Sequence, residues 1–480
     1  MTIRDLQPKL IWEIFDQITA VPRPSKREGK IIEYLLDFAK QHNLEAVRDD
    51  IGNVVIRKGA TAGYEALPTV ILQSHMDMVC EKNSDTEHNF DTDPICTKIV
   101  DGWVKAEGTT LGADCGIGMA AALAVLVDPT VEHGAIEALF TVDEETGLTG
   151  AFNLGEGMLT GKYLINLDSE DEGEIFIGCA GGVDTLGYFD YTTQTLPAGY
   201  EYYRIGVSGL KGGHSGDDID KGLGNANKIL AHFLYDAERF GIRLGMFDGG
   251  NLRNAIPREA YAVVAVPEHT ALLFETSLAT YVSAVKALYA ATEPSLKITL
   301  GQAAEQPVID EDTQSSLLAA IVGLPNGVLA MSQAMKGLVE TSTNTASVKF
   351  VDSKIVVTTS QRSSVELAKK SAMHSVEAVL VLAGAEVEHS DGYPGWAPNP
   401  DSSLLHCTVE SYKSLFGTEP KVRAIHAGLE CGLFLEKYPH LEMVSFGPTL
   451  RGVHSPDERL EIATVDKFWQ LLLDVLKKVK

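Results

Sequence analysis

The stretch that decides the fold is residues 69–77, TVILQSHMD, in which an apolar, strand-like run ends on His75 and Asp77. Two further apolar runs end in the same way, on Glu144–Glu145 and on Asp168. In an open α/β sheet, ligands bind beyond the carboxyl ends of the strands, so these side chains are expected to meet despite their separation in the chain. Carboxylates crowded together in this way need cations. The pattern therefore predicts an α/β sheet with a metal site at its edge.

Composition sets the class of the protein. A length of 480 residues predicts more than one domain, and 45% hydrophobic residues suffices for cores of ordinary size. The net charge of -26 argues against nucleic acid or an anionic membrane as a partner. The N-terminus carries no export signal and no long apolar run follows, so we expect a cytoplasmic protein. Six dispersed cysteines without a Cys-x-x-Cys pair predict reduced thiols.

The order of the predicted elements indicates a discontinuous domain. Helices and strands alternate up to about residue 187, as in a sheet covered on both faces. Between 188 and 392 the strand runs are longer, which is typical of an α+β domain, and a Gly- and Pro-rich segment follows. We predict an α/β mixed-sheet domain, 1–187 and 393–480, with an α+β domain inserted at 188–392. The insert's two β-α-β-like stretches are consistent with two related halves.

Each candidate ligand also has an ordinary explanation. On a strand, His75 and Asp77 point to the same side, so Asp77 can accept from one imidazole nitrogen while the other binds metal. A single His-x-Asp is otherwise a common coincidence of surface loops. Asp114 precedes a helix of small residues, where it could serve as an N-cap or bridge two cations.

The remaining candidates lie in polar surroundings. Glu144 and Glu145 could form a solvated turn, or one could hold metal while the other moves protons. Asp168 is followed by further acidic residues that could simply face solvent. His454 lies in a polar loop and has no predicted core to belong to.

Taken in order, this set of residues resembles the co-catalytic dizinc peptidase and deacylase family. The resemblance runs from end to end and includes the segments that begin at Gly209 (GLKGGHSG) and Ile425 (IHAGLECG). It implies a zinc-peptidase catalytic domain with an inserted lid domain, and two Zn²⁺ per chain for which Co²⁺ or Mn²⁺ can substitute. The implied ligands are His75 and Asp168 for one zinc, Glu145 and His454 for the other, and Asp114 as the bridge.

The resemblance also implies a reaction. It points to a cytosolic dipeptidase that hydrolyses unblocked dipeptides, including those that end in His such as β-alanyl-histidine. Glu144 is then the general base for the attacking water, with Asp77 beside His75. His214, in a loop of the insert, is implied to stabilise the oxyanion when the lid closes, from the same chain or from a partner subunit.

Substrate binding is assigned to four residues of the predicted lid and its return segment. Arg362 could clamp a C-terminal carboxylate through two hydrogen bonds, although a surface arginine at a strand end is the ordinary explanation. Gly428 could present backbone N–H groups at a helix start to the same carboxylate. Asn254 and His426 complete the predicted substrate-binding set.

One position departs from the family pattern. Relatives commonly carry Asn directly after the bridging Asp, where this chain has Cys115. A thiol near zinc predicts sensitivity to oxidation or an altered metal preference.

Two alternative functions stay open. An N-acyl amino-acid deacylase would use the same metals and base on an acetyl or succinyl amide. A catalytically silent metal-binding scaffold is the other alternative, and the intact Glu144 counts against it. A small peptide is the expected partner, and if the chain oligomerises we expect a homodimer.

Overall fold

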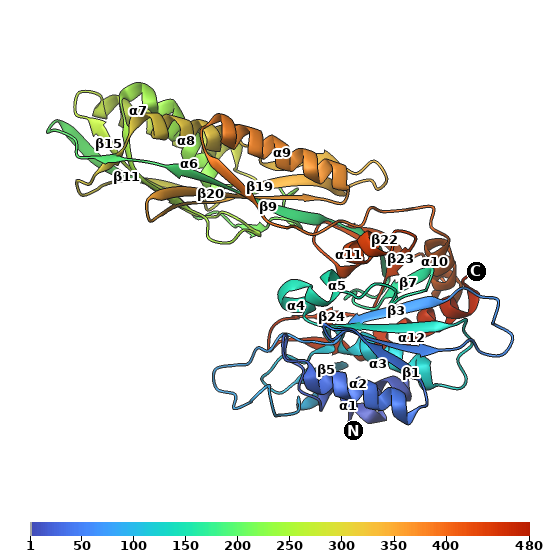
Figure 1. Ribbon diagram of the computed structural model, residues 1–480. Coiled ribbons are helices and arrows are strands. Elements are labelled where there is room, and N and C mark those ends of the chain that lie inside the picture. Colours follow the sequence, from blue (N-terminus) through green and yellow to red (C-terminus); the bar gives the residue numbers. More distant parts are fainter. Residues whose placement is uncertain (1) are drawn as a thin grey trace. The chain divides into compact units, whose positions relative to one another are not determined.

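The protein is described by a computed structural model that covers residues 2–480, and its internal contacts divide the chain into two compact units (Figure 1). The first unit runs up to Gly178 and takes in Pro398–Ala424 and Leu429–Lys480. The second unit comprises Cys179–Ala397 and Ile425–Gly428. Both units combine helices with a mixed or antiparallel sheet, so the predicted α/β class is confirmed.

An eight-stranded mixed sheet forms the centre of the first unit, in the order β1-β2-β6-β3-β7-β23-β8-β22. β3 pairs in parallel with both β6 and β7, and β7 pairs in parallel with β23, so these four strands have their carboxyl ends at one edge. β3, β6 and β7 are buried along their whole length, which explains their uninterrupted apolar runs. The strands are β1 (Glu45–Arg48), β2 (Val54–Lys58), β3 (Val70–His75), β6 (Ile136–Thr141), β7 (Tyr163–Asn166), β8 (Glu174–Cys179), β22 (Lys421–Ile425) and β23 (Glu442–Ser445).

Helices of the first unit pack against this sheet and against one another. α3 packs on β3 and on α1, while α10 packs on α12 and β23. The helices are α1 (Lys9–Thr19), α2 (Gly29–Gln41), α3 (Ala113–Val127), α4 (Glu144–Gly147), α5 (Thr149–Phe152), α10 (Ser403–Phe416), α11 (Glu430–Lys437) and α12 (Ile462–Lys478). A small sheet joins β24 (Leu450–Arg451), β25 (Arg459–Glu461), β5 (Trp103–Ala106) and β4 (Thr97–Val100) in that order.

A nine-stranded antiparallel sheet forms the second unit. Eight strands follow the order β16-β11-β15-β13-β19-β20-β9-β21, and β18 pairs with β19 beside this path. The strands are β9 (Gly181–Asp190), β11 (Tyr200–Ser208), β13 (Arg243–Gly249), β15 (Ala260–Pro267), β16 (Lys297–Gln302), β18 (Gly327–Met331), β19 (Val339–Val351), β20 (Lys354–Ser363) and β21 (Glu386–His389). Two short pairs accompany it: β10 (Thr193–Gln194) with β17 (Val308–Ile309), and β12 (Gly213–His214) with β14 (Ala255–Ile256).

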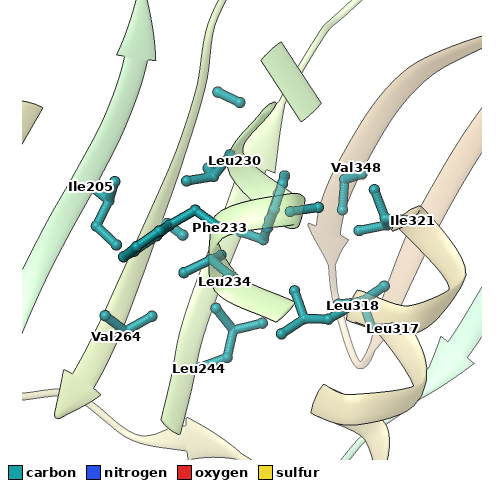
Figure 2. Close-up of a cluster of buried hydrophobic side chains, with 14 of the residues drawn as sticks. Ile205, Leu230, Phe233, Leu234, Leu244, Val264, Leu317, Leu318, Ile321 and Val348 are labelled. Atoms are coloured by element: carbon teal, nitrogen blue, oxygen red, sulfur yellow. The ribbon is translucent and has the colours of Figure 1, made fainter. Parts of the chain in front are cut away.

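Four helices lie along this sheet and enclose its core (Figure 1). They are α6 (Ala226–Ala237), α7 (Ala271–Leu288), α8 (Glu311–Gly323) and α9 (Glu366–Leu382). Figure 2 shows Phe233 of α6 among side chains from α8 and from the strands, with Leu318 and Val264 nearby. Phe233 is 2% exposed, and its ring also contacts those of Phe274 and Tyr281 on α7.

One helix of the described chain, α7, is long and apolar enough by length and composition to cross a membrane. It contains the charged residues Glu275 and Lys286. Its Phe274, Leu278 and Val285 belong to the core of the second unit. These contacts are those of a helix that covers the sheet of a globular domain.

Removal of the Phe233 ring is expected to destabilise the second unit. Phe233→Ala leaves a cavity in a closely packed core and should lower the free energy of unfolding by about 3–5 kcal/mol. Urea denaturation followed by circular dichroism measures this change. Tyr235→Ala is the matched control, because Tyr235 lies on the same helix with 47% of its surface exposed. That control should cost about 0.5 kcal/mol or less, and equal losses in the two variants would contradict the packing described here.

Candidate metal centre

His75, Asp114 and Asp168 meet at the carboxyl edge of the first unit's sheet. His75 is the last residue of β3, and Asp168 follows β7, the parallel neighbour of β3. Nε2 of His75 lies 3.0 Å from Oδ1 of Asp114 and 3.2 Å from Oδ1 of Asp168. The His75 side chain is 1% exposed. Neighbouring strands thus bring His75 and Asp168 together, and the start of α3 adds the carboxylate of Asp114.

His454 and Glu145 meet the other side of Asp114. Nε2 of His454 lies 2.9 Å from Oε2 of Glu145 and 3.4 Å from Oδ2 of Asp114. Glu145 lies in the first turn of α4, directly after β6, while His454 reaches the centre from the loop after β24 with a left-handed backbone (φ 60°). The two oxygens of Asp114 therefore face two different imidazoles.

The backbone around Asp114 is not that of a helix cap. Gly112 occupies the N-cap position of α3 and no side chain caps the helix. Asp114 has extended dihedral angles (φ -81°, ψ 112°), and the peptide bond to Cys115 is cis. The N-cap explanation for Asp114 is therefore wrong, because its carboxylate points to the two histidines instead.

The donor set fits divalent metal binding. Asp168 Oδ1 and Glu145 Oε1 are buried oxygens that lack a hydrogen-bond partner within the described chain. Buried carboxylate oxygens without donors are costly unless a cation takes the place of a proton. His75, Asp114 and Glu145 offer ligand atoms that all lie within 4.8 Å of one another. Imidazole and carboxylate ligands of this kind suit zinc.

The pKa values show the same demand for positive charge. Burial raises the pKa of the Asp168 carboxyl to about 6. Hydrogen bonds to Asp114 and Glu145 raise the pKa of His454 to about 11. In the protein alone, the proton on His454 balances part of the carboxylate charge. Metal ions would displace that proton, as ligand histidines must be neutral to bind.

Asp77 joins the His75 strand to the Glu144–Glu145 turn. Its carboxylate is buried, accepts from the backbone N–H groups of Glu144 (3.1 Å) and Glu145 (3.3 Å), and accepts from Ser25 Oγ at 2.8 Å. Its Oδ1 also lies 3.4 Å from Nδ1 of His75, the ring nitrogen that faces away from Asp114. Asp77 therefore holds the His75 ring and the backbone of the Glu144–Glu145 turn in a fixed relation to each other.

Glu144 stands beside this centre with a free carboxylate. Its backbone is held by Asp77, whereas its side chain forms no hydrogen bond to any described residue. Burial raises the pKa of Glu144 well above the usual value for a glutamate. A general base requires a carboxylate that is free to bind a proton and has an increased affinity for it, and Glu144 has both properties.

Two buried charged residues that the sequence analysis missed hold the loop before Asp114. Glu458 accepts from the backbone N–H groups of Leu111 (2.7 Å), Gly112 (3.0 Å) and Ala113 (2.8 Å). Arg23 donates to the carbonyl oxygens of Gly112, Met76 and Asp77. The two charges tie the Asp114 loop to the end of β3. The only local sequence signal was that Glu458 follows His454 by four positions.

A buried layer of polar side chains lies under the ligands, and the sequence analysis missed this too. Glu430 Oε2 accepts from Gln73 Nε2 (2.6 Å) and Thr141 Oγ1 (2.9 Å). Gln73 Oε1 in turn accepts from Asn166 Nδ2 (2.6 Å), and Asn166 Oδ1 accepts from Ser445 Oγ (2.5 Å). Gln73 and Asn166 each precede a candidate ligand by two positions, so the layer links the strand ends that carry the ligands.

Cys115 is enclosed beside this centre. Its thiol is 1% exposed and donates to the Leu167 carbonyl at 3.3 Å. Burial raises the pKa of the Cys115 thiol well above its usual value. Oxidants react with exposed thiolates. The structure therefore argues against the predicted sensitivity to oxidation.

The second unit holds the other predicted residues. His214 and Asn254 line a cavity of about 560 Å³. Nδ1 of His214 accepts from the backbone N–H groups of Gly216 (3.3 Å) and Asp217 (3.2 Å), which leaves the proton of the neutral ring on Nε2. Burial lowers the pKa of His214, and Arg362 lowers it further. His214 is therefore a neutral hydrogen-bond donor.

Arg362, His426 and Gly428 belong to a second group in this unit. Arg362 is 7% exposed, its Nε has no hydrogen-bond partner, and no described carboxylate lies within ion-pair distance of it. The surface explanation for Arg362 is therefore wrong. His426 Nε2 lies 2.7 Å from Ser342 Oγ, and burial, with Arg362, lowers the pKa of His426 to about 4. A buried guanidinium without a counter-ion carries an uncompensated charge, which an anion would neutralise.

Loss of the Glu430 carboxylate is expected to weaken metal binding. Glu430→Leu breaks the polar layer under His75 and Asp168 and should lower zinc affinity about 10- to 100-fold. Glu430→Gln is the matched control, because an amide oxygen can still accept from Gln73 and Thr141. Competition with a chromogenic chelator measures the affinity, and circular dichroism checks the fold. Wild-type affinity in Glu430→Leu would show that the layer does not position the ligands.

Comparisons with known proteins agree with this geometry. Residues 71–478 match Peptidase family M20/M25/M40. The chain is 44% identical over 479 residues to a protein of Escherichia coli (strain K12) named cytosol non-specific dipeptidase, with 99% of each chain covered. It is also similar to the crystal structure of aminoacylhistidine dipeptidase from Vibrio alginolyticus, with a TM-score of 0.96 and 43% identity over 100% of this chain and 98% of that one.

A more distant structure shares the fold alone. The aminopeptidase PepT of Bacillus cereus has a TM-score of 0.58 at 17% identity, with 99% of both chains covered. The resemblance to metal-dependent peptidases drawn from the ordered residues is thus confirmed. The chain belongs to Peptidase family M20/M25/M40, a family of metal-dependent hydrolases.

Proposed function

We propose that the protein is a dipeptidase that hydrolyses unblocked dipeptides, including those that end in histidine such as β-alanyl-histidine. The observation that carries the proposal is the arrangement of two imidazoles on opposite oxygens of Asp114, with the free carboxylate of Glu144 beside them. The names of the two relatives that match along the full chain support the choice of dipeptides over other amides.

The proposed metal sites share Asp114. His75 and Asp168 would hold one Zn²⁺, Glu145 and His454 would hold the other, and Co²⁺ or Mn²⁺ could substitute. When bound, the two ions would lower the pKa of the attacking water and polarise the peptide carbonyl. Asp77 would keep the His75 ring in the orientation that presents Nε2 to the metal.

Proton transfer is assigned to Glu144. Its carboxylate takes a proton from the attacking water and delivers that proton to the leaving amine. The Asp77 hydrogen bonds to the Glu144 and Glu145 backbone hold this base at a fixed place beside the ligands. No covalent enzyme intermediate is needed.

The predicted lid would supply the remaining groups. His214 would donate Nε2–H to the oxyanion, since its Nδ1 already accepts from the backbone. Arg362 would bind the C-terminal carboxylate, together with Asn254, His426 and the backbone at Gly428. We place the enzyme in the cytoplasm, in line with the name of the Escherichia coli relative.

The substrate class is tested by comparing the hydrolysis of two amide substrates. Zinc-loaded wild type should hydrolyse β-alanyl-histidine and leave N-acetyl-ornithine intact. Glu144→Gln should lower kcat about 10²- to 10⁴-fold, while zinc content stays at the wild-type level because Glu144 is not a ligand. Turnover of the acetylated substrate alone would make the protein a deacylase. No turnover of either, with zinc bound, would favour the silent scaffold.

Arg362 is expected to act on substrate binding alone. Arg362→Met should raise KM for dipeptides roughly 10- to 100-fold, the cost of losing hydrogen bonds to a charged partner. The kcat should change little. Arg204→Met is the matched control, because Arg204 is exposed on β11 and stacks on Tyr261. An unchanged KM in Arg362→Met would remove the arginine from the substrate site.

A further inference from the structure

Tyr393 occupies one end of a row of residues that crosses the sheet of the second unit. Ser342 of β19 pairs with Arg362 of β20, and Arg362 pairs with Gly182 of β9. Gly182 pairs in turn with Tyr393, whose backbone N–H donates to the Gly182 carbonyl at 2.8 Å. Ser342 holds His426 at the opposite end of the row. The backbone of Arg362 is thus paired with a neighbouring strand on each side.

The ring of Tyr393 packs between two glycines. A Cβ atom added at Gly182 would lie 2.8 Å from one edge of the ring, and one added at Gly428 would lie 2.8 Å from the other edge. The Lys369 ammonium also donates to the Tyr393 carbonyl at 2.6 Å. Only glycine fits at the two neighbouring positions, and the ring is held between them.

The hydroxyl of Tyr393 contacts the buried guanidinium. Tyr393 Oη lies 3.1 Å from Nη1 of Arg362. A carboxylate at this position would orient Arg362 equally well, but it would neutralise the charge that a substrate carboxylate needs. A phenol is a neutral acceptor. Burial also raises the pKa of Tyr393, which keeps the phenol uncharged.

We propose that Tyr393 is a positioning and specificity-determining residue, which holds Arg362 ready for the C-terminal carboxylate of the peptide without neutralising its charge. The inference rests on the proposed dipeptidase function. Pre-organisation of this kind lowers the cost of ordering the arginine when substrate binds. Tyr393 thereby favours substrates with a free carboxylate over those with a blocked C-terminus.

The test removes one oxygen atom from the protein. Tyr393→Phe keeps the ring between the two glycines and should raise KM for β-alanyl-histidine about 3- to 10-fold, with kcat unchanged. KM for the C-terminal amide of β-alanyl-histidine should not change. Tyr188→Phe is the matched control, because Tyr188 lies on the same strand β9 as Gly182 and its hydroxyl donates to Glu388, away from Arg362. An unchanged KM, or an equal rise for the acid and the amide, would overturn the proposal.

A binding measurement separates this proposal from the dipeptidase function itself. In a zinc-loaded Glu144→Gln background, titration calorimetry compares β-alanyl-histidine with its amide, with Tyr393 present or replaced by Phe. A preference for the acid that shrinks in Tyr393→Phe supports the role of Tyr393 even where wild type cleaves no dipeptide. A preference that is the same with and without the hydroxyl, or no preference in either protein, overturns it.

Discussion

Concentration of negative charge at the ends of adjacent parallel strands is the constraint on which the first unit depends. Asp114, Glu145 and Asp168 converge there with Glu144, and part of their oxygen surface is buried without donors. Such an arrangement is unstable unless positive charge is supplied, by protons on the imidazoles or by metal ions. The two histidines therefore stand where each can exchange a proton for a metal.

Three buried carboxylates around the centre accept hydrogen bonds from the segments that carry the candidate ligands. Asp77 binds the backbone of the Glu144–Glu145 turn, Glu458 binds the backbone before Asp114, and Glu430 binds Gln73 and Thr141. Each carboxylate accepts hydrogen bonds from a different segment of the chain. Positions of the ligands are thus set by the scaffold, and a rigid scaffold is what gives a metal site its geometry.

Much of the metal centre could be predicted from the sequence because its ligands follow parallel strands, whose carboxyl ends lie at one edge of the sheet. Apolar runs that end on His75, Glu144 and Asp168 become neighbouring strands, so a one-dimensional pattern specifies a place in space. The burial of Arg362 could not be predicted in this way, since it depends on β19 and β9 on either side of its strand. The Gln73–Glu430 bond joins residues 357 positions apart, and nothing local signals it.

The separation of 340 positions between Asp114 and His454 has a consequence for the order in which the centre assembles. The carboxylate of Asp114 finds its second imidazole only 340 residues later, after the whole second unit has been synthesised. Domains fold as the chain emerges during translation. A nascent chain can therefore assemble the His75 side of the centre early but cannot complete the pair. The two imidazoles that face Asp114 can therefore come together only after residue 454 has left the ribosome.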